Sequence, residues 1–229
     1  MRRAFDTART HPSAVLLFGQ LLAVLAYPFF DESAPGRALL GLIGTVLVLV
    51  ALWAVRRTPA LTGMAVILGA PAVVFNVLEA VFPTDDWAVL GSALLHAPFY
   101  FYISYGMIRY LFHDDRVTRD ELFATGAAFT VVAWGFAYVY SAAQIIWPGS
   151  FVAYDGAGDR SWFELLFLSF TTLTSVGLSD VIPVLAHARS LVMIEQVVGV
   201  LYVALVVARL VGLTTARAAR RGMDPNDEG

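Results

Sequence analysis

The feature that most restricts the fold of this chain is a series of apolar runs, each long enough to cross a bilayer as a helix. A spanning helix needs about 20 predominantly apolar residues, and such runs follow one another along almost the whole 229-residue chain. Only 14% of the residues are charged, whereas soluble domains carry about 25%. We therefore expect an all-α integral membrane protein without a sizeable soluble domain.

Six of these runs are predicted to span the membrane. Aromatic residues gather at their ends, as in the aromatic belts of membrane interfaces. The first run follows Arg2, Arg3 and Arg9, but it is too long for a signal peptide and no small-residue cleavage site follows it, so we count it as a span. The predicted spans cover residues 13–30, 38–55, 61–82, 87–112, 122–147 and 186–215.

The placement of arginine predicts the orientation of the spans. Cytoplasmic loops of membrane proteins collect basic residues, and all fifteen basic residues of this chain are arginine. With the N-terminus inside, only Arg37, Arg160 and Arg189 lie on the outer side. We expect both termini in the cytoplasm and the helices in a plasma membrane, with a prokaryotic source.

Composition and motifs also exclude several functions. The chain contains no cysteine, which excludes thiolate chemistry and cysteine-bound metals. No HExxH, no GxSxG and no pair of intramembrane aspartates is present, so we expect no enzymatic activity and no cofactor. The net charge of −3 favours no nucleic-acid partner, and no motif indicates a soluble ligand.

The stretch between the fifth and sixth spans is neither a simple loop nor another span. It begins with polar, turn-prone residues that include Asp155 and Asp159, and it continues as a short apolar helix predicted over 161–173. That helix is too short to cross a bilayer. Non-helical backbone at membrane depth persists only where it is buried in protein or lines a water-filled path. We therefore expect a re-entrant element that builds a pore or a cavity.

The residues after this short helix resemble the signature of the potassium-channel family. The segment 174–180 reads T-S-V-G-L-S-D and aligns without gaps with the family's T-T-V-G-Y-G-D. The resemblance implies a homotetramer in which each subunit supplies one wall of a selectivity filter for monovalent cations. It implies ion sites at the backbone carbonyls of Ser175, Val176, Gly177 and Leu178, with support from Thr174, Ser179 and Asp180.

The resemblance extends to the last span and divides the chain. Gly199 lies where this family often places a gating hinge, and the valines at 200, 203, 207 and 211 are implied to line an apolar cavity. We expect four N-terminal helices over 1–120, a pore module over 121–216 and a short cytoplasmic tail over 217–229. Within the pore module we expect a pore helix at 161–173, a filter at 174–180 and an inner helix at 186–215. The cavity lining is Val200, Val203, Val207 and Val211.

Two filter residues depart from the family signature. Leu178 replaces a tyrosine that braces the filter, and its hydroxyl hydrogen bond is lost. Ser179 replaces a glycine, and we expect a cost of about 1 to 2 kcal/mol if a non-glycine residue keeps a left-handed backbone there. The predicted function is a channel for potassium with weakened selectivity. A non-selective Na⁺/K⁺ channel and a non-conducting filter remain alternatives, whereas a secondary transporter would show paired internal repeats, which this chain lacks.

Several polar residues within the spans carry further expectations. Ionisable groups inside a membrane are costly and often functional, and we expect Glu195 to bond to the back of the pore helix. For Glu79 and His96 we favour hydrogen bonds between helices over a proton-sensing pair. Arg109 is the only arginine of the fourth span, so we predict no voltage sensor. Asp159 and Asp155 are candidates for a negative pore entrance.

Overall fold

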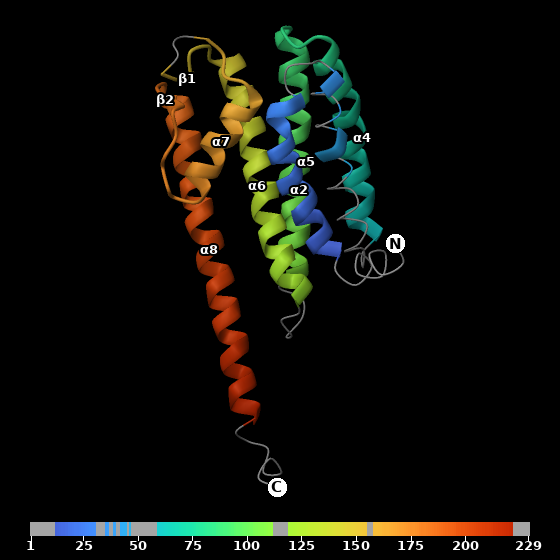
Figure 1. Ribbon diagram of the computed structural model, residues 1–229, viewed down its shortest axis with the longest axis vertical. Coiled ribbons are helices and arrows are strands. Elements are labelled where there is room, and N and C mark those ends of the chain that lie inside the picture. Colours follow the sequence, from blue (N-terminus) through green and yellow to red (C-terminus); the bar gives the residue numbers. More distant parts are fainter. Residues whose placement is uncertain are drawn as a thin grey trace.

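The structure is a computed structural model that describes residues 12–30, 35–36, 39, 42–44, 46, 59–111, 119–154 and 158–221. Figure 1 shows long helices that run lengthwise, with a short helix and two short strands at one end. The predicted second span, 38–55, lies almost wholly outside the described residues. The elements are α2 (Pro12–Phe30), α4 (Pro59–Val81), α5 (Asp86–Leu111), α6 (Arg119–Ile146), β1 (Phe151–Val152), α7 (Trp162–Leu173), β2 (Ile182–Pro183) and α8 (Ala186–Arg221).

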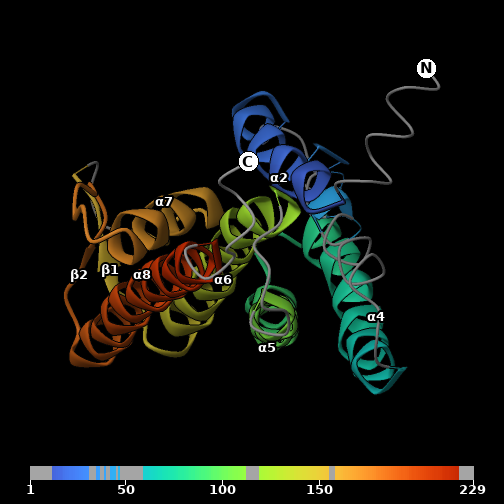
Figure 2. The ribbon, with the colours of Figure 1, turned by 90° about the horizontal axis from the view of Figure 1, so that it is seen from below.

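Helix α6 lies at the centre of the fold. It packs against α2 and α5 on one side and against α7 and α8 on the other, an arrangement that the view along the helices makes plain (Figure 2). Small residues such as Ala127, Ala133 and Ala137 are fully buried along α6. Small side chains let neighbouring helix backbones approach closely in membrane proteins, which explains how α6 can contact four helices.

Four described helices, α2, α4, α6 and α8, are long and apolar enough to cross a membrane. Helix α5 has 26 residues, which is sufficient length, but polar residues such as Ser92, His96 and Ser104 lower its mean hydropathy, and all three are buried. For four of the six predicted segments, the structure therefore contains a helix with the length and hydropathy of a span. This protein is an integral membrane protein with several apolar helices.

The chain between α6 and α8 enters the bundle and returns to the end from which it came. Helix α7 starts at the end of the molecule where β1 lies, and the segment after it turns back to β2 at that same end (Figure 1). The two strands pair antiparallel, with Val152 opposite Ile182. A short apolar helix in a re-entrant segment is what the sequence predicts for this stretch.

One stripe of α8 packs against the rest of the molecule. Ala188, Val192, Glu195, Gly199 and Tyr202 recur every three or four residues and are buried, as expected for one face of a helix. The Tyr202 hydroxyl donates a hydrogen bond to the Thr125 carbonyl of α6 at 2.5 Å. The remaining face of α8 is largely exposed, and its lower half extends beyond the other helices (Figure 1).

Candidate functional site

The pore helix α7 begins with a reciprocal cap. The Glu164 backbone N–H donates to the Ser161 hydroxyl at 3.3 Å, and the Ser161 backbone N–H donates to the Glu164 carboxylate at 2.7 Å. Each bond satisfies an amide that a helix start would otherwise leave unpaired. The Ser-x-x-Glu pattern is a sequence signature of this cap, so the sequence itself indicates where α7 begins.

A second set of bonds ties the start of α7 to the end of α6. The Gln144 side chain accepts the Arg160 backbone N–H and donates to the Arg160 carbonyl, both at 2.9 Å. The Arg160 guanidinium lies 3.3 Å from the Glu164 carboxylate and also donates to the Gly158 carbonyl. Arg160 is only 7% exposed. Its burial and these bonds give Arg160, one of the three arginines predicted on the outer side, a structural role that the sequence did not reveal.

Removing the capping hydroxyl tests how firmly the start of α7 is held. Ser161→Ala is expected to destabilise the folded protein by about 0.5 to 2 kcal/mol, the usual cost of losing a helix N-cap. Thermal unfolding in detergent measures it. Ser190→Ala is the matched control, because the Ser190 hydroxyl only bonds the Ala186 carbonyl of its own helix at 3.0 Å. Equal melting temperatures for the two variants would contradict the role of the cap.

The C-terminal end of α7 turns directly into the predicted filter. Thr174 is the C-cap, and Ser175 follows with a left-handed backbone, φ 61°. The Ser175 N–H donates to the Thr172 carbonyl at 2.9 Å and the Gly177 N–H to the Thr171 carbonyl at 3.0 Å. A left-handed residue one position after the C-cap is a common helix ending, usually built on glycine. The last carbonyls of α7 are thus bonded by the first filter residues.

The left-handed backbone that would cause strain at Ser179 is not present. The left-handed residues of this segment are Ser175 and Gly177, whereas Ser179 has no positive φ. The Ser179 hydroxyl instead accepts the Val181 N–H at 3.1 Å, a local turn that serine forms readily. Ser179 therefore forms a hydrogen-bonded turn in place of the left-handed conformation of a glycine. The energetic cost of a left-handed non-glycine residue arises at Ser175 instead.

The predicted filter residues lie on an open side of the chain. Thr174, Ser175, Val176, Gly177 and Leu178 are all exposed, Leu178 to 74%. They are preceded by Leu173, which is 1% exposed, and followed by Val181, at 2%. Both ends of the segment are therefore anchored in the core while its middle faces outward.

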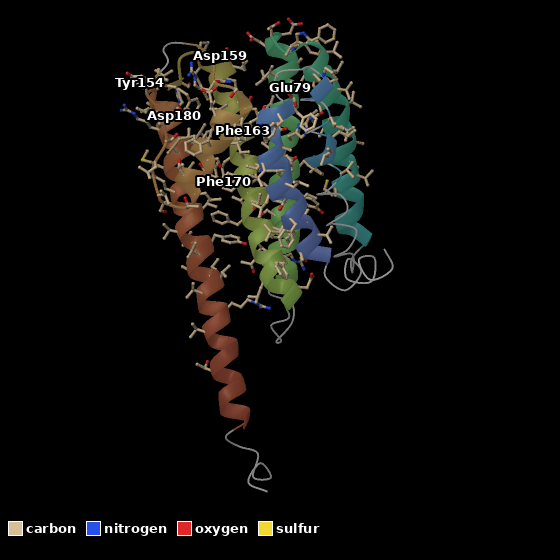
Figure 3. All side chains as sticks on the ribbon, viewed as in Figure 1. Glu79, Tyr154, Asp159, Phe163, Phe170 and Asp180 are labelled. Atoms are coloured by element: carbon tan, nitrogen blue, oxygen red, sulfur yellow. The ribbon has the colours of Figure 1, made fainter. Side chains whose placement is uncertain are left out.

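The acidic residues near this segment take different positions. Asp180 is exposed, and its carboxylate forms no hydrogen bond or ion pair within the part of the chain that the structure describes. The expectation that Asp180 anchors the filter by hydrogen bonds therefore finds no support. Asp159 is exposed beside Arg160 at the same end of the molecule (Figure 3), and Asp155 lies outside the described residues.

The carboxylate of Glu195 joins three helices behind the filter. Glu195 of α8 is fully buried and forms hydrogen bonds with the Ser169 hydroxyl of α7 and the Tyr140 hydroxyl of α6. The Ser169 hydroxyl is also 2.8 Å from the Ala133 carbonyl of α6. The predicted bond from Glu195 to the back of the pore helix is confirmed, and Tyr140 is a partner that the sequence did not reveal.

Gly199 lies where α8 meets the end of α7. A Cβ added at Gly199 would overlap the backbone carbonyl of Leu173, the last residue of α7. Glycine is therefore required here for close approach of two backbones. Its predicted part as a gating hinge stays a prediction.

The four valines predicted to line a cavity share the exposed part of α8. Their exposed fractions lie between 51% and 58%. None of them belongs to the buried stripe of α8, so they are available to line a pore. The residues are Val200, Val203, Val207 and Val211.

A strap outside the filter was not predicted from the sequence. Besides the β1–β2 pair, the Val184 N–H donates to the Ser150 carbonyl at 3.0 Å. The Trp147 and His187 rings stack with centroids 4.3 Å apart. These contacts join the end of α6 to the start of α8, and so hold the chain on both sides of the predicted filter.

The buried His96 of α5 differs from expectation. His96 of α5 contacts Ser92, one turn earlier in its own helix, at 2.9 Å, and its ring stacks on Tyr138 of α6. The His96 Nε2 has no hydrogen-bond partner in the described part of the chain. Within the described residues, His96 therefore contacts α6 by ring stacking and not by the predicted interhelical hydrogen bond.

Comparison with known proteins agrees with this geometry. Residues 126–216 match the family model described as an ion channel. This part of the chain is therefore similar to ion-channel pore domains of the potassium-channel-like, two-helix type, which are channels and not enzymes. No curated protein and no solved structure matches the chain.

Proposed function

We propose that four copies of this chain form a channel for monovalent cations that favours potassium with weakened selectivity. The observation that carries the proposal is the segment Ser175–Leu178, which is exposed directly after the C-terminal end of a buried pore helix. Backbone carbonyls in that position can replace the hydration shell of a cation, and the negative end of the helix dipole favours it.

The exposed surface of a single chain supports assembly with further copies. Apolar filter residues such as Val176 and Leu178 are 60% and 74% exposed, at the end of α7 where a water-filled path is proposed. One chain supplies one wall, and a ring of four walls encloses an axis. The valines of the exposed α8 face would line the inner cavity of that ring, and Gly199 would serve as its hinge.

The weakened selectivity has a physical basis that differs from strain. The orientation of the peptide between Leu178 and Ser179 depends on φ of Ser179, which is not left-handed. The Leu178 carbonyl is therefore oriented differently from one that precedes a left-handed glycine. We expect the outer ion site to change. At positions 176 and 177 the chain has the same residues as the signature, Val176 and Gly177.

The proposal also covers the domain division and the orientation of the whole chain. The division into an N-terminal region over 1–120, a pore module over 121–216 and a tail over 217–229 remains the most economical one. We place both termini in the cytoplasm of a prokaryotic cell. The N-terminal helices are proposed to support α6 rather than to sense voltage, because Arg109 is the only arginine in α5.

The reversal potential of the purified protein in planar bilayers tests the proposal. With potassium on one side and sodium on the other, the wild-type potential is expected between zero and the potassium equilibrium value. Leu178→Tyr with Ser179→Gly is expected to move it toward potassium, because the signature residues return to both positions. Leu185→Tyr, outside the filter, is the control and should leave the potential unchanged.

The possible results separate the parts of the proposal. A wild-type potential already at the potassium value would contradict the weakened filter. The absence of any cation current, with the four-copy assembly intact by mass measurement, would favour the non-conducting alternative. A monomeric protein in detergent and in lipid nanodiscs would contradict the channel itself.

A further inference from the structure

A cavity of about 530 Å³ lies outside the filter, between the end of α4, the end of α6 and the start of α7. Pockets for small molecules typically measure about 300 to 1,000 Å³ and combine an apolar wall with a few polar groups. This cavity has that size, and its far wall is the N-terminal turn of the pore helix, formed by Ser161, Trp162 and Phe163.

Aromatic rings form much of the cavity wall. Trp162 is central, because its ring lies 5.4 Å from the Tyr138 ring and 6.1 Å from the Trp134 ring. Tyr27 stacks on Phe163 at 4.4 Å. Aromatic faces attract cations, most strongly where water is excluded.

The charged residues that line the cavity favour a cation as well. Three carboxylates, Glu79, Asp86 and Asp159, line it together with one guanidinium, that of Arg160. Arg160 is paired with Glu164, which lies at 3.3 Å. The described lining therefore carries a net negative charge. Figure 3 shows that Glu79 and Asp159 lie at the same end of the molecule.

We propose that this cavity binds the ammonium group of a small organic cation. The aromatic wall and the carboxylates would hold that group. Such a group occurs in soluble amino alcohols and in the headgroups of zwitterionic lipids. A ligand here contacts the start of the pore helix, so, if the proposed channel function holds, its binding acts on the filter from behind.

A titration with choline tests the proposal. The protein is held in phosphatidylglycerol nanodiscs, and its intrinsic tryptophan fluorescence is recorded. Choline is expected to give a saturable change in emission. Glu79→Gln and the exposed Asp159→Asn should each weaken its affinity about tenfold, which corresponds to about 1.4 kcal/mol. Asp85→Asn removes the same charge from an exposed residue that does not line the cavity, and it should leave the affinity unchanged.

Adding phosphatidylethanolamine to the nanodiscs distinguishes a lipid headgroup from a soluble amine as the source of the ammonium group. A lower apparent choline affinity would support a lipid headgroup in the cavity, and an unchanged affinity would support a soluble amine. No saturable response with either lipid, or a response that Glu79→Gln and Asp159→Asn leave unaltered, would overturn the proposal. The assay needs no ion current, so its failure is distinguishable from a failure of the channel proposal.

Discussion

Replacing Gly199 with alanine is expected to displace α8 from the end of the pore helix and to suppress ion conduction. The added methyl group would overlap the carbonyl oxygen of Leu173 and approach its carbonyl carbon and Cα. All three are backbone atoms, so the overlap cannot be relieved by a side-chain rotation. Extra methylene groups in a packed core typically cost about 1 to 3 kcal/mol, and here the displaced backbone leads directly into the filter.

Gly212 of the same helix provides the matched control. A Cβ added at Gly212 would meet nothing within 4 Å, and alanine is about 1 kcal/mol more favourable than glycine inside a helix. Gly212→Ala is therefore expected to keep or raise the melting temperature, whereas Gly199→Ala should lower it. Both variants are compared by thermal unfolding in detergent and by potassium flux into liposomes.

The same two variants distinguish a packing role of Gly199 from a role as a hinge. A residue that acts only as a hinge changes the opening of the pore and leaves the stability of the closed fold intact. A Gly199→Ala protein with the melting temperature of Gly212→Ala but reduced flux would therefore favour the hinge. Loss of both stability and flux would support the close approach to Leu173.

The general arrangement of the pore module followed from the sequence because strong physical constraints act along the chain. The length and hydropathy of α6 and α8 identify them as spans, and the short apolar run before the filter is too short to be one. A charged residue in a spanning helix needs a polar partner, which led to the bond between Glu195 and the pore helix. These inferences depend on bilayer thickness and solvation rather than on details of packing.

The backbone of the filter depended on interactions that the sequence does not show. The choice between left-handed Ser175 and left-handed Ser179 is made by local bonds, namely Ser175 to Thr172 and Val181 to Ser179. Serine is compatible with both conformations, so residue type alone did not decide between them. An alignment transfers residue identities, but it does not transfer the hydrogen bonds that set each φ.

The hydrogen bonds between Gln144 and Arg160 at the start of α7 were missed for a related reason. Gln144 and Arg160 are sixteen residues apart, and glutamine at the end of a span is an ordinary interfacial residue. Only the fold brings the Gln144 amide against the Arg160 backbone. The Ser161–Glu164 cap, in contrast, is local, and its Ser-x-x-Glu spacing is a signal from which the cap could have been predicted.

Glu195→Leu is expected to cause a large loss of stability, whereas Glu195→Gln is expected to preserve most of it. Leucine removes the carboxylate that accepts the hydrogen bond of the buried Tyr140 hydroxyl, and an unsatisfied buried hydroxyl costs about 1 to 3 kcal/mol. Glutamine can keep every bond, because its oxygen accepts from Tyr140 and its amide donates to Ser169. The Ser169 hydroxyl then donates to the Ala133 carbonyl, which lies 2.8 Å away.

Thermal unfolding of both variants, together with Tyr140→Phe, measures this network. Tyr140→Phe in the Glu195→Leu background should cost little further stability, because the hydroxyl has already lost its acceptor, whereas in the wild type the same change should be costly. Equal losses from Tyr140→Phe in both backgrounds would show that the two residues are not coupled. If glutamine is as damaging as leucine, the negative charge of Glu195 is required, and a neutral hydrogen-bonded network cannot hold α7 between α6 and α8.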